Sequence, residues 1–121
     1  MKDKFKDDRV YLTHLMENIQ KIESSFKGTT KEEYAQDVDL QDATFRRVEI
    51  IGSAAKNVSK KTKEKHPEVK WAKIAGARDK LIPGYAMVDK DIVYRINEDI
   101  IELKKQVLEM LEELNKEAKE K

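Results

Sequence analysis

Residues 91–114, with the sequence DIVYRINEDIIELKKQVLEMLEEL, decide the fold class of this chain. Apolar side chains recur there at alternating spacings of three and four residues, at Val93, Ile96, Ile100, Leu103, Val107, Met110 and Leu114. This period is typical of an α-helix with one apolar face. Other helices must cover that face, so the stretch predicts a helical bundle. We expect the face to be shared between the chain's own bundle and a second copy of the chain.

The first half of the chain predicts further helices of the same amphipathic kind. Apolar positions at helical spacing run from Asp7 to Phe26, and the pair Lys27-Gly28 ends that helix. Residues 29–33, TTKEE, fit a capping box, which starts a short helix near residue 31. A longer helix follows from about Leu40 to Lys63, with Asp37 or Asp39 as its N-cap.

The helix over 40–63 is expected to be the central core helix. One of its faces carries Thr44, Val48, Ile51, Ala55 and Val58. Gly52, Ala54 and Ala55 are small enough to let a neighbouring helix approach closely. Pro67 is placed to open a fourth helix that ends near Leu81, and Asp89 is expected to cap the last helix.

These patterns together predict an all-α, up-and-down bundle of four main helices plus a short helix. The 121 residues are expected to form a single domain over positions 1–121, with a frayed tail, NKEAKEK, at about 115–121. A chain of this length has one core of limited size, which a partner subunit would extend. We therefore expect the bundle to dimerise.

Composition excludes several classes of site and location. Charged residues make up 40% of the chain and hydrophobic residues 39%, and cysteine is absent, which excludes disulfides and thiolate zinc sites. We expect no metal site and no cofactor. No apolar run is long enough to span a membrane, and the start of the chain, MKDKFKDDR, lacks the apolar core of a signal peptide. A cytoplasmic protein without membrane contact is expected.

A net charge of +1 provides no strong attraction of the whole molecule to nucleic acid, so any RNA binding must depend on a local basic patch. Arg46, Arg47 and Lys56 are the candidate RNA-binding residues, and further lysines follow at Lys60, Lys61, Lys63 and Lys65. The competing interpretation is that these charges only solubilise an exposed helix face.

The stretch Arg78-Asp79-Lys80-Leu81-Ile82-Pro83-Gly84-Tyr85 carries the candidate catalytic residues. Arg78 lies beside an apolar stripe that includes Trp71, Ala75 and Ile82. A guanidinium in that position needs a carboxylate, a carbonyl or a phosphate as its partner, because burying an unpaired charge is costly. Position 83 holds a proline, which has no donor on its backbone and no titratable side chain.

With the upstream run FRRVEIIGSAAKNVSKKTKEKHPEVKWAKIAGARDKLI, this stretch resembles the HepT toxin family of the HEPN superfamily. The resemblance covers most of positions 9 to 115. The motif of these RNA-cleaving proteins is R-x4-H-x-Y, which Arg78 and Tyr85 match and Pro83 does not. Ser53, where the family often has Glu, is a second and milder departure.

The resemblance implies metal-independent cleavage of RNA, expected to be tRNA, with Arg78, Asp79, the residue at position 83 and Tyr85 as the catalytic set. Arg would stabilise the charge that develops on phosphate, and His would transfer the proton. Because Pro83 replaces that His, we expect the sequence to be inactive or severely impaired. The alternative is a noncatalytic HEPN binding module, the partner subunit of a nucleotidyltransferase.

The family also implies a type VII toxin–antitoxin pair. Its antitoxin, a minimal nucleotidyltransferase, would use ATP and Mg²⁺ to transfer AMP to Tyr85, and the toxin would be a homodimer. The competing interpretation of Tyr85 is that it only packs against the turn at Pro83-Gly84. His14 and His66 are interpreted as surface or helix-boundary residues, and Trp71 as a core residue.

Overall fold

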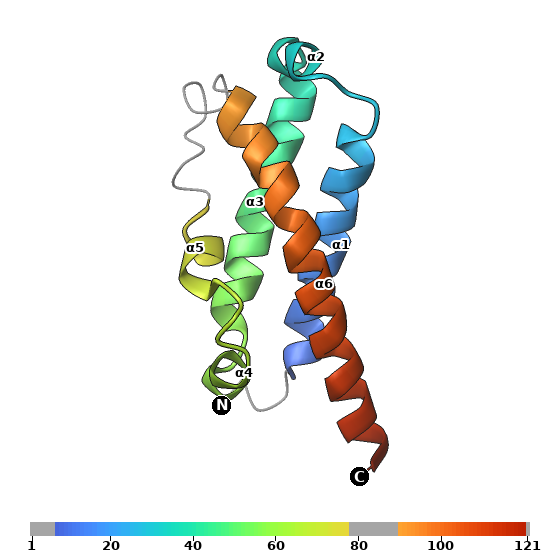
Figure 1. The fold of residues 1–121 in the computed structure, drawn as a ribbon, viewed down its shortest axis with the longest axis vertical. Coiled ribbons are helices and arrows are strands. Elements are labelled where there is room, and N and C mark those ends of the chain that lie inside the picture. Colours follow the sequence, from blue (N-terminus) through green and yellow to red (C-terminus); the bar gives the residue numbers. More distant parts are fainter. Residues whose placement is uncertain (1–6, 78–89, 121) are drawn as a thin grey trace.

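The computed structural model describes residues 7–77 and 90–120, and all of the regular structure in these two ranges is helical. In chain order the helices are α1 (Asp8–Phe26), α2 (Lys31–Gln36), α3 (Val38–Asn57), α4 (Lys60–Lys65), α5 (Trp71–Ala75) and α6 (Lys90–Glu120). The three long helices α1, α3 and α6 lie side by side along the long axis, with α2 at one end and α5 beside α3 (Figure 1). The predicted all-α bundle is confirmed.

The first two helices begin where the sequence places their caps. The Oδ1 atom of Asp7 accepts a hydrogen bond of 2.7 Å from the backbone N–H of Arg9 at the start of α1. Gly28, with φ 78°, follows the end of α1 in the left-handed conformation that favours glycine. At α2, Thr30 and Glu33 exchange side-chain to backbone hydrogen bonds of 2.9 and 3.0 Å, so the predicted capping box is confirmed.

The core lies where the apolar faces of α1, α3 and α6 meet. Its buried side chains include Leu12, Leu15, Ile19 and Ile22 from α1, Val48, Ile51 and Ala55 from α3, and Ile100, Leu103, Val107 and Met110 from α6. Every position of the predicted α3 face is buried, including Thr44 and Val58. The Thr44 hydroxyl donates a hydrogen bond to the Leu40 carbonyl oxygen at 2.8 Å, which satisfies it in an apolar setting.

The central helix is shorter than the expected 40–63. It ends at Asn57, Val58 is extended, and α4 then starts with Ser59 as its N-cap. The carboxylate of Asp8 accepts hydrogen bonds from the backbone N–H of Ser59 at 2.9 Å and from its hydroxyl at 2.7 Å, and it also accepts one from the Thr62 hydroxyl. This contact with the start of α1 stabilises the break.

The fourth helix also differs from its prediction, which ran from Pro67 to about Leu81. Pro67 lies in a turn instead of opening a helix, and α5 starts at Trp71 and ends at Ala75, where Gly76 is its C-cap. The turn is held by the backbone N–H of Val69, which donates to the His66 carbonyl oxygen at 3.2 Å. Residues 78–81 and the predicted cap Asp89 lie outside the described residues.

The tail over 115–121, expected to fray, instead continues α6 as far as Glu120. Two contacts hold this last part of the helix to the rest of the bundle. The ammonium group of Lys65 lies 3.4 Å from a carboxylate oxygen of Glu117, and a guanidinium nitrogen of Arg9 lies 3.4 Å from Oδ1 of Asn115. Within 7–77 and 90–120, no helix combines the length and the apolar content that a membrane span requires.

Candidate functional site

The motif residues Arg78, Asp79, Pro83 and Tyr85 lie outside the described residues, so their predicted roles stay predictions. The described chain reaches α5 and Ala77, directly before Arg78, and resumes at Lys90 in α6. The surfaces beside α5 are therefore the described surfaces nearest to the motif along the sequence.

One hollow beside α5 contains two of the three candidate RNA-binding residues. We call it the α1–α3–α5 groove. It has a volume of about 470 Å³ and is lined by Tyr11, His14, Arg46, Glu49, Ile50, Gly52, Ser53, Ala54, Lys56, Asn57 and Ala75. The groove thus brings Arg46 and Lys56 together with a histidine, a tyrosine and an amide.

Small residues explain why α5 lies so close to α3 at this groove. A Cβ atom added to Gly52 would lie 3.1 Å from the Ala75 carbonyl oxygen and 3.3 Å from that of Ile74. Both distances are shorter than ordinary van der Waals contacts, so any larger residue at position 52 would force the two helices apart. The predicted close approach of a neighbouring helix at Gly52 is confirmed.

The charged groups of the groove belong mainly to its outer part. The Arg46 side chain is 71% exposed and lies 3.0 Å from a carboxylate oxygen of Glu49, one turn further along α3. Lys56 and Asn57 are exposed near the end of the same helix. An exposed ion pair of this kind contributes little stability, so the Arg46 guanidinium can exchange Glu49 for another anion at small cost.

Arg47 points elsewhere. Its guanidinium donates hydrogen bonds to the Ser25 hydroxyl at 2.6 Å and to the Lys21 carbonyl oxygen at 3.4 Å, both on α1. The side chain thereby links α3 to the far part of α1. The structure does not bring Arg47 together with Arg46 and Lys56 in the groove.

A second hollow, of about 420 Å³, lies between α3, α5 and α6 and has a different chemical character. Val48, Ile51, Ile74, Ala77, Ile100 and Leu103 supply its apolar wall. Its charged groups are the carboxylates of Glu68, Asp99 and Glu102 and the ammonium groups of Lys70 and Lys73. Lys73 lies 3.3 Å from Asp99. Carboxylates thus outnumber cations, an arrangement that repels phosphate.

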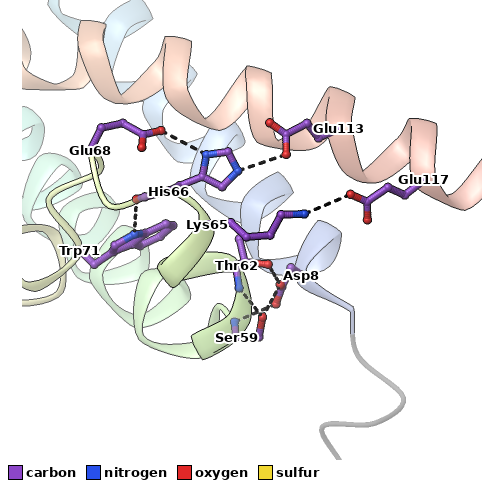
Figure 2. A network of polar contacts seen from close by, with 9 residues as sticks. All are labelled: Asp8, Ser59, Thr62, Lys65, His66, Glu68, Trp71, Glu113 and Glu117. Carbon is purple, nitrogen blue, oxygen red and sulfur yellow. Dashed lines mark hydrogen bonds and ion pairs between the residues drawn. The ribbon is translucent and has the colours of Figure 1, made fainter.

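The two histidines occupy different settings. His14 is exposed on α1 and lines the α1–α3–α5 groove. His66 is the C-cap of α4, which confirms its interpretation as a helix-boundary residue. Its Nδ1 atom lies 3.1 Å from a carboxylate oxygen of Glu68, and its Nε2 atom lies 3.2 Å from one of Glu113 on α6 (Figure 2). The backbone N–H of Glu68 and the His66 ring keep the pKa of Glu68 below its usual value.

Trp71 is half-buried and packs against the core, as its position on the apolar line predicted. Its Nε1–H donates a hydrogen bond to the His66 carbonyl oxygen at 3.1 Å, which ties α5 to the end of α4 (Figure 2). The Lys63 ammonium group lies 5.8 Å from the centre of the indole ring, within cation–π range. These contacts explain Trp71 as a structural residue.

Sequence reasoning missed three members of the groove. No pattern in the sequence predicted a ligand contact for Tyr11, Ser53 or Asn57. Only the folded structure places all three around one hollow. The one signal in the sequence was the run of small residues at Gly52 and Ala54, which predicted the close helix approach but not the hollow beside it.

Comparison with known proteins identifies the family. The model of the family described as "Ribonuclease HepT-like" matches residues 15–111. The chain belongs to the HepT-like ribonuclease family. The matched range includes α2, α3, α4 and α5, all the groove residues except Tyr11 and His14, and the motif positions from Arg78 to Tyr85.

Individual HepT-like relatives agree with the family match. A "Putative RNase" of Caldanaerobacter subterraneus subsp. tengcongensis is 42% identical over 108 residues, which cover 88% of this chain and 96% of the relative. The "Probable ribonuclease HepT" of Thermococcus cleftensis is 39% identical over 105 residues, 86% of this chain and 93% of the relative.

A longer relative, the "Gamma-glutamylcyclotransferase and putative RNase" of Methanocaldococcus jannaschii, is 39% identical over 112 residues. The match covers 92% of this chain but only 50% of that protein, so the chain spans half of its length. No solved structure matches the chain significantly.

Proposed function

We propose that this chain is the ribonuclease-fold toxin of a type VII toxin–antitoxin pair, built for metal-independent cleavage of tRNA in the cytoplasm. The observation that carries this proposal is the spacing of Arg78, position 83 and Tyr85 in a HepT-like chain. Arg78 would stabilise the charge that develops on the scissile phosphate, with Asp79 orienting it, and Tyr85 would hydrogen-bond the phosphate or stack on a base. No cofactor takes part in this chemistry.

Pro83 removes the proton-transfer group from this set, so the chain as given should cleave RNA poorly or not at all. General acid–base catalysis contributes about 10²–10⁴-fold to a rate. Pro83→His should therefore raise the rate of tRNA cleavage by a factor in that range. The measurement compares the two purified chains on total tRNA in the presence of EDTA, which separates metal-independent cleavage from contaminating nucleases.

A second candidate function is that of a noncatalytic HEPN module that binds a nucleotidyltransferase partner. The observation in its favour is Pro83 itself, because a binding module does not need the motif histidine. Absence of cleavage by both chains would favour this candidate. Cleavage by the Pro83→His chain alone would identify the chain as a disabled enzyme.

Tyr85 is proposed as the site at which the antitoxin silences the toxin. The Tyr85 oxygen would attack the α-phosphorus of ATP and lose its proton, and the bond to pyrophosphate would break. The AMP group adds a negative phosphate beside Arg78, which would block an RNA phosphate. Mass spectrometry after incubation with a minimal nucleotidyltransferase, ATP and Mg²⁺ should show the mass of one added AMP group per chain. Tyr85→Phe should remain unmodified, and AMP on that variant would place the acceptor elsewhere.

A further inference from the structure

We propose that the α1–α3–α5 groove binds single-stranded RNA, with Arg46 and Lys56 contacting separate phosphates of one strand. The choice of RNA as the ligand rests on the proposed function. The new element is that RNA is bound by residues outside the R-x4-H-x-Y motif. It follows from the shape of the groove, the spacing of its cations and the other groups that line it.

Residue size explains the depth of the groove. Gly52 and Ala54 are buried at its inner part, whereas Arg46, Lys56 and Asn57 are exposed at its outer part. Long side chains around a wall of small ones leave a hollow of about 470 Å³. A nucleotide base can enter such a hollow while its phosphate stays at the surface.

The distance between Arg46 and Lys56 favours an RNA strand over a single small anion as the ligand. Arg46 and Lys56 are ten residues apart on α3, which separates them by about 15 Å along the helix axis at the usual rise of an α-helix. One phosphate ion cannot contact both groups across that distance. Two phosphates separated along an extended strand can, and Asn57 adds an exposed amide at the Lys56 end.

The electrostatic balance of the groove also favours a polyanion. Its lining carries the two cations against a single carboxylate, Glu49, whereas the hollow between α3, α5 and α6 carries more carboxylates than cations. The Arg46 guanidinium already contacts a carboxylate at 3.0 Å in an exposed position. A phosphate oxygen can take the place of that carboxylate, because it offers the same geometry to the guanidinium.

The remaining polar groups of the groove suit bases. Tyr11 presents an aromatic ring at the start of α1, and His14 is exposed one turn further along. Proteins that bind single strands combine such rings with a basic track for the backbone. The groove also includes Ala75, the last residue of α5, which is three residues before Arg78 in the sequence.

Fluorescence anisotropy with a short, labelled, single-stranded oligoribonucleotide tests the proposal on the chain as it stands, with Pro83 preventing the proposed cleavage. Arg46→Gln/Lys56→Gln should weaken binding about tenfold near physiological salt. The slope of log K against log salt should fall in magnitude by about 1.4, the value for two lost contacts to a single strand. Arg46→Lys should retain most of the binding, because it keeps the charge.

The matched control is Lys105→Gln/Lys116→Gln, which removes two exposed charges from α6 instead of α3. It should bind RNA within about twofold of the parent, and circular dichroism should show that both double variants remain folded. If the control variant weakened RNA binding equally, affinity would depend only on the net charge of the protein, and the assignment of binding to the groove would be overturned. Unchanged binding by the groove variant, or no RNA binding by the parent, would also overturn it.

The same substitutions in the Pro83→His chain separate this inference from the proposed function. If that chain cleaves tRNA, the groove variant should raise KM and leave kcat nearly unchanged, because it removes uniform binding. A lower kcat with an unchanged KM would contradict the groove assignment but not the proposed ribonuclease function. If the Pro83→His chain does not cleave tRNA but the groove variant still loses RNA affinity, RNA binding by the groove is supported and the proposed ribonuclease function is rejected.

Discussion

Tyr34 is a core residue with an unusual hydroxyl. Its side chain, which belongs to α2, is fully buried, and its ring centre lies 5.2 Å from that of Phe26 in α1. Among the described residues its hydroxyl makes no hydrogen bond; the Thr44 hydroxyl lies near enough to lower the Tyr34 pKa but donates its own hydrogen bond to the Leu40 carbonyl oxygen. Burial raises the pKa of Tyr34 to about 12. The residue therefore contributes an aromatic ring to the core and leaves a polar atom unsatisfied.

Tyr34→Phe should increase the free energy of unfolding by about 1 kcal/mol at neutral pH, because a buried hydroxyl without a partner carries its full desolvation cost. Urea unfolding followed by circular dichroism measures the change. Destabilisation by a similar amount would mean that the hydroxyl has a partner in solution.

The same residue predicts an alkaline dependence. The pKa is higher in the folded chain than in the unfolded chain, where it lies near 10, so the stability linked to Tyr34 is complete below pH 10. It is lost as the pH rises from about 10 towards 12, by an amount on the order of 2 kcal/mol. Tyr34→Phe should remove this part of the loss of stability at alkaline pH. If the stability of the variant fell with pH in the same way as that of the parent, the loss could not be assigned to Tyr34.

The junction between α3 and α4 shows how a contact remote in sequence sets the end of a helix. The residues over 40–63 contain no proline, so local preferences allow one continuous helix. Ser59 instead caps α4 by accepting a hydrogen bond from the backbone N–H of Thr62 at 3.2 Å, and Asp8 binds Ser59 from the start of α1. The predicted end of this helix was wrong because Asp8 is 51 residues away from Ser59.

Ser59→Ala should destabilise the chain by about 1–2 kcal/mol, since it removes an N-cap and a hydrogen bond to Asp8. Thermal unfolding at neutral pH measures the loss. Ser24→Ala, at an exposed position within α1, is the matched control and should change stability by less than about 0.5 kcal/mol. Equal effects of the two substitutions would show that the capping contact is not formed.

The described part of the predicted apolar face of α6 packs within the bundle of a single chain. Ile100, Leu103, Val107 and Met110 are buried in the core, where α6 packs mainly on α1, and the helix nevertheless exposes Ile101 by 53% and Leu108 by 50%. These two positions are one heptad apart and so lie on the same side of the helix. We infer that this second side contributes to the proposed homodimer, in which two copies of Arg78 and Tyr85 would share a cleft.

Sedimentation equilibrium should therefore give a mass of about twice the 14.1 kDa of one chain. Ile101→Glu/Leu108→Glu should shift the equilibrium towards the monomer, because two charges would lose hydration in a dimer contact. Lys61→Gln, at an exposed position of α4, should leave the mass unchanged. A monomeric parent would contradict the homodimer, and an unaffected double variant would move its interface away from Ile101 and Leu108.

Local patterns were sufficient to predict α1, α2 and the buried faces of α3 and of the described part of α6. The three-and-four spacing in α6, the capping box at Thr30 and the stop at Gly28 depend on residues within about one or two turns of each other, so they can be recognised in the chain before it folds. The family resemblance followed for the same reason, since its residues are contiguous.

Packing between distant segments decided the rest. Asp8 binds Ser59 at the break after α3, 51 residues away in the sequence, and Arg9 and Lys65 contact the part of α6 beyond its expected end. Gly52 allows α5 to approach α3 at the α1–α3–α5 groove, which Arg46 lines, whereas Arg47, the next residue, turns towards α1. Consecutive side chains point about 100° apart around an α-helix, so contact with a ligand depends on which helices surround each side chain and not on the charge run itself.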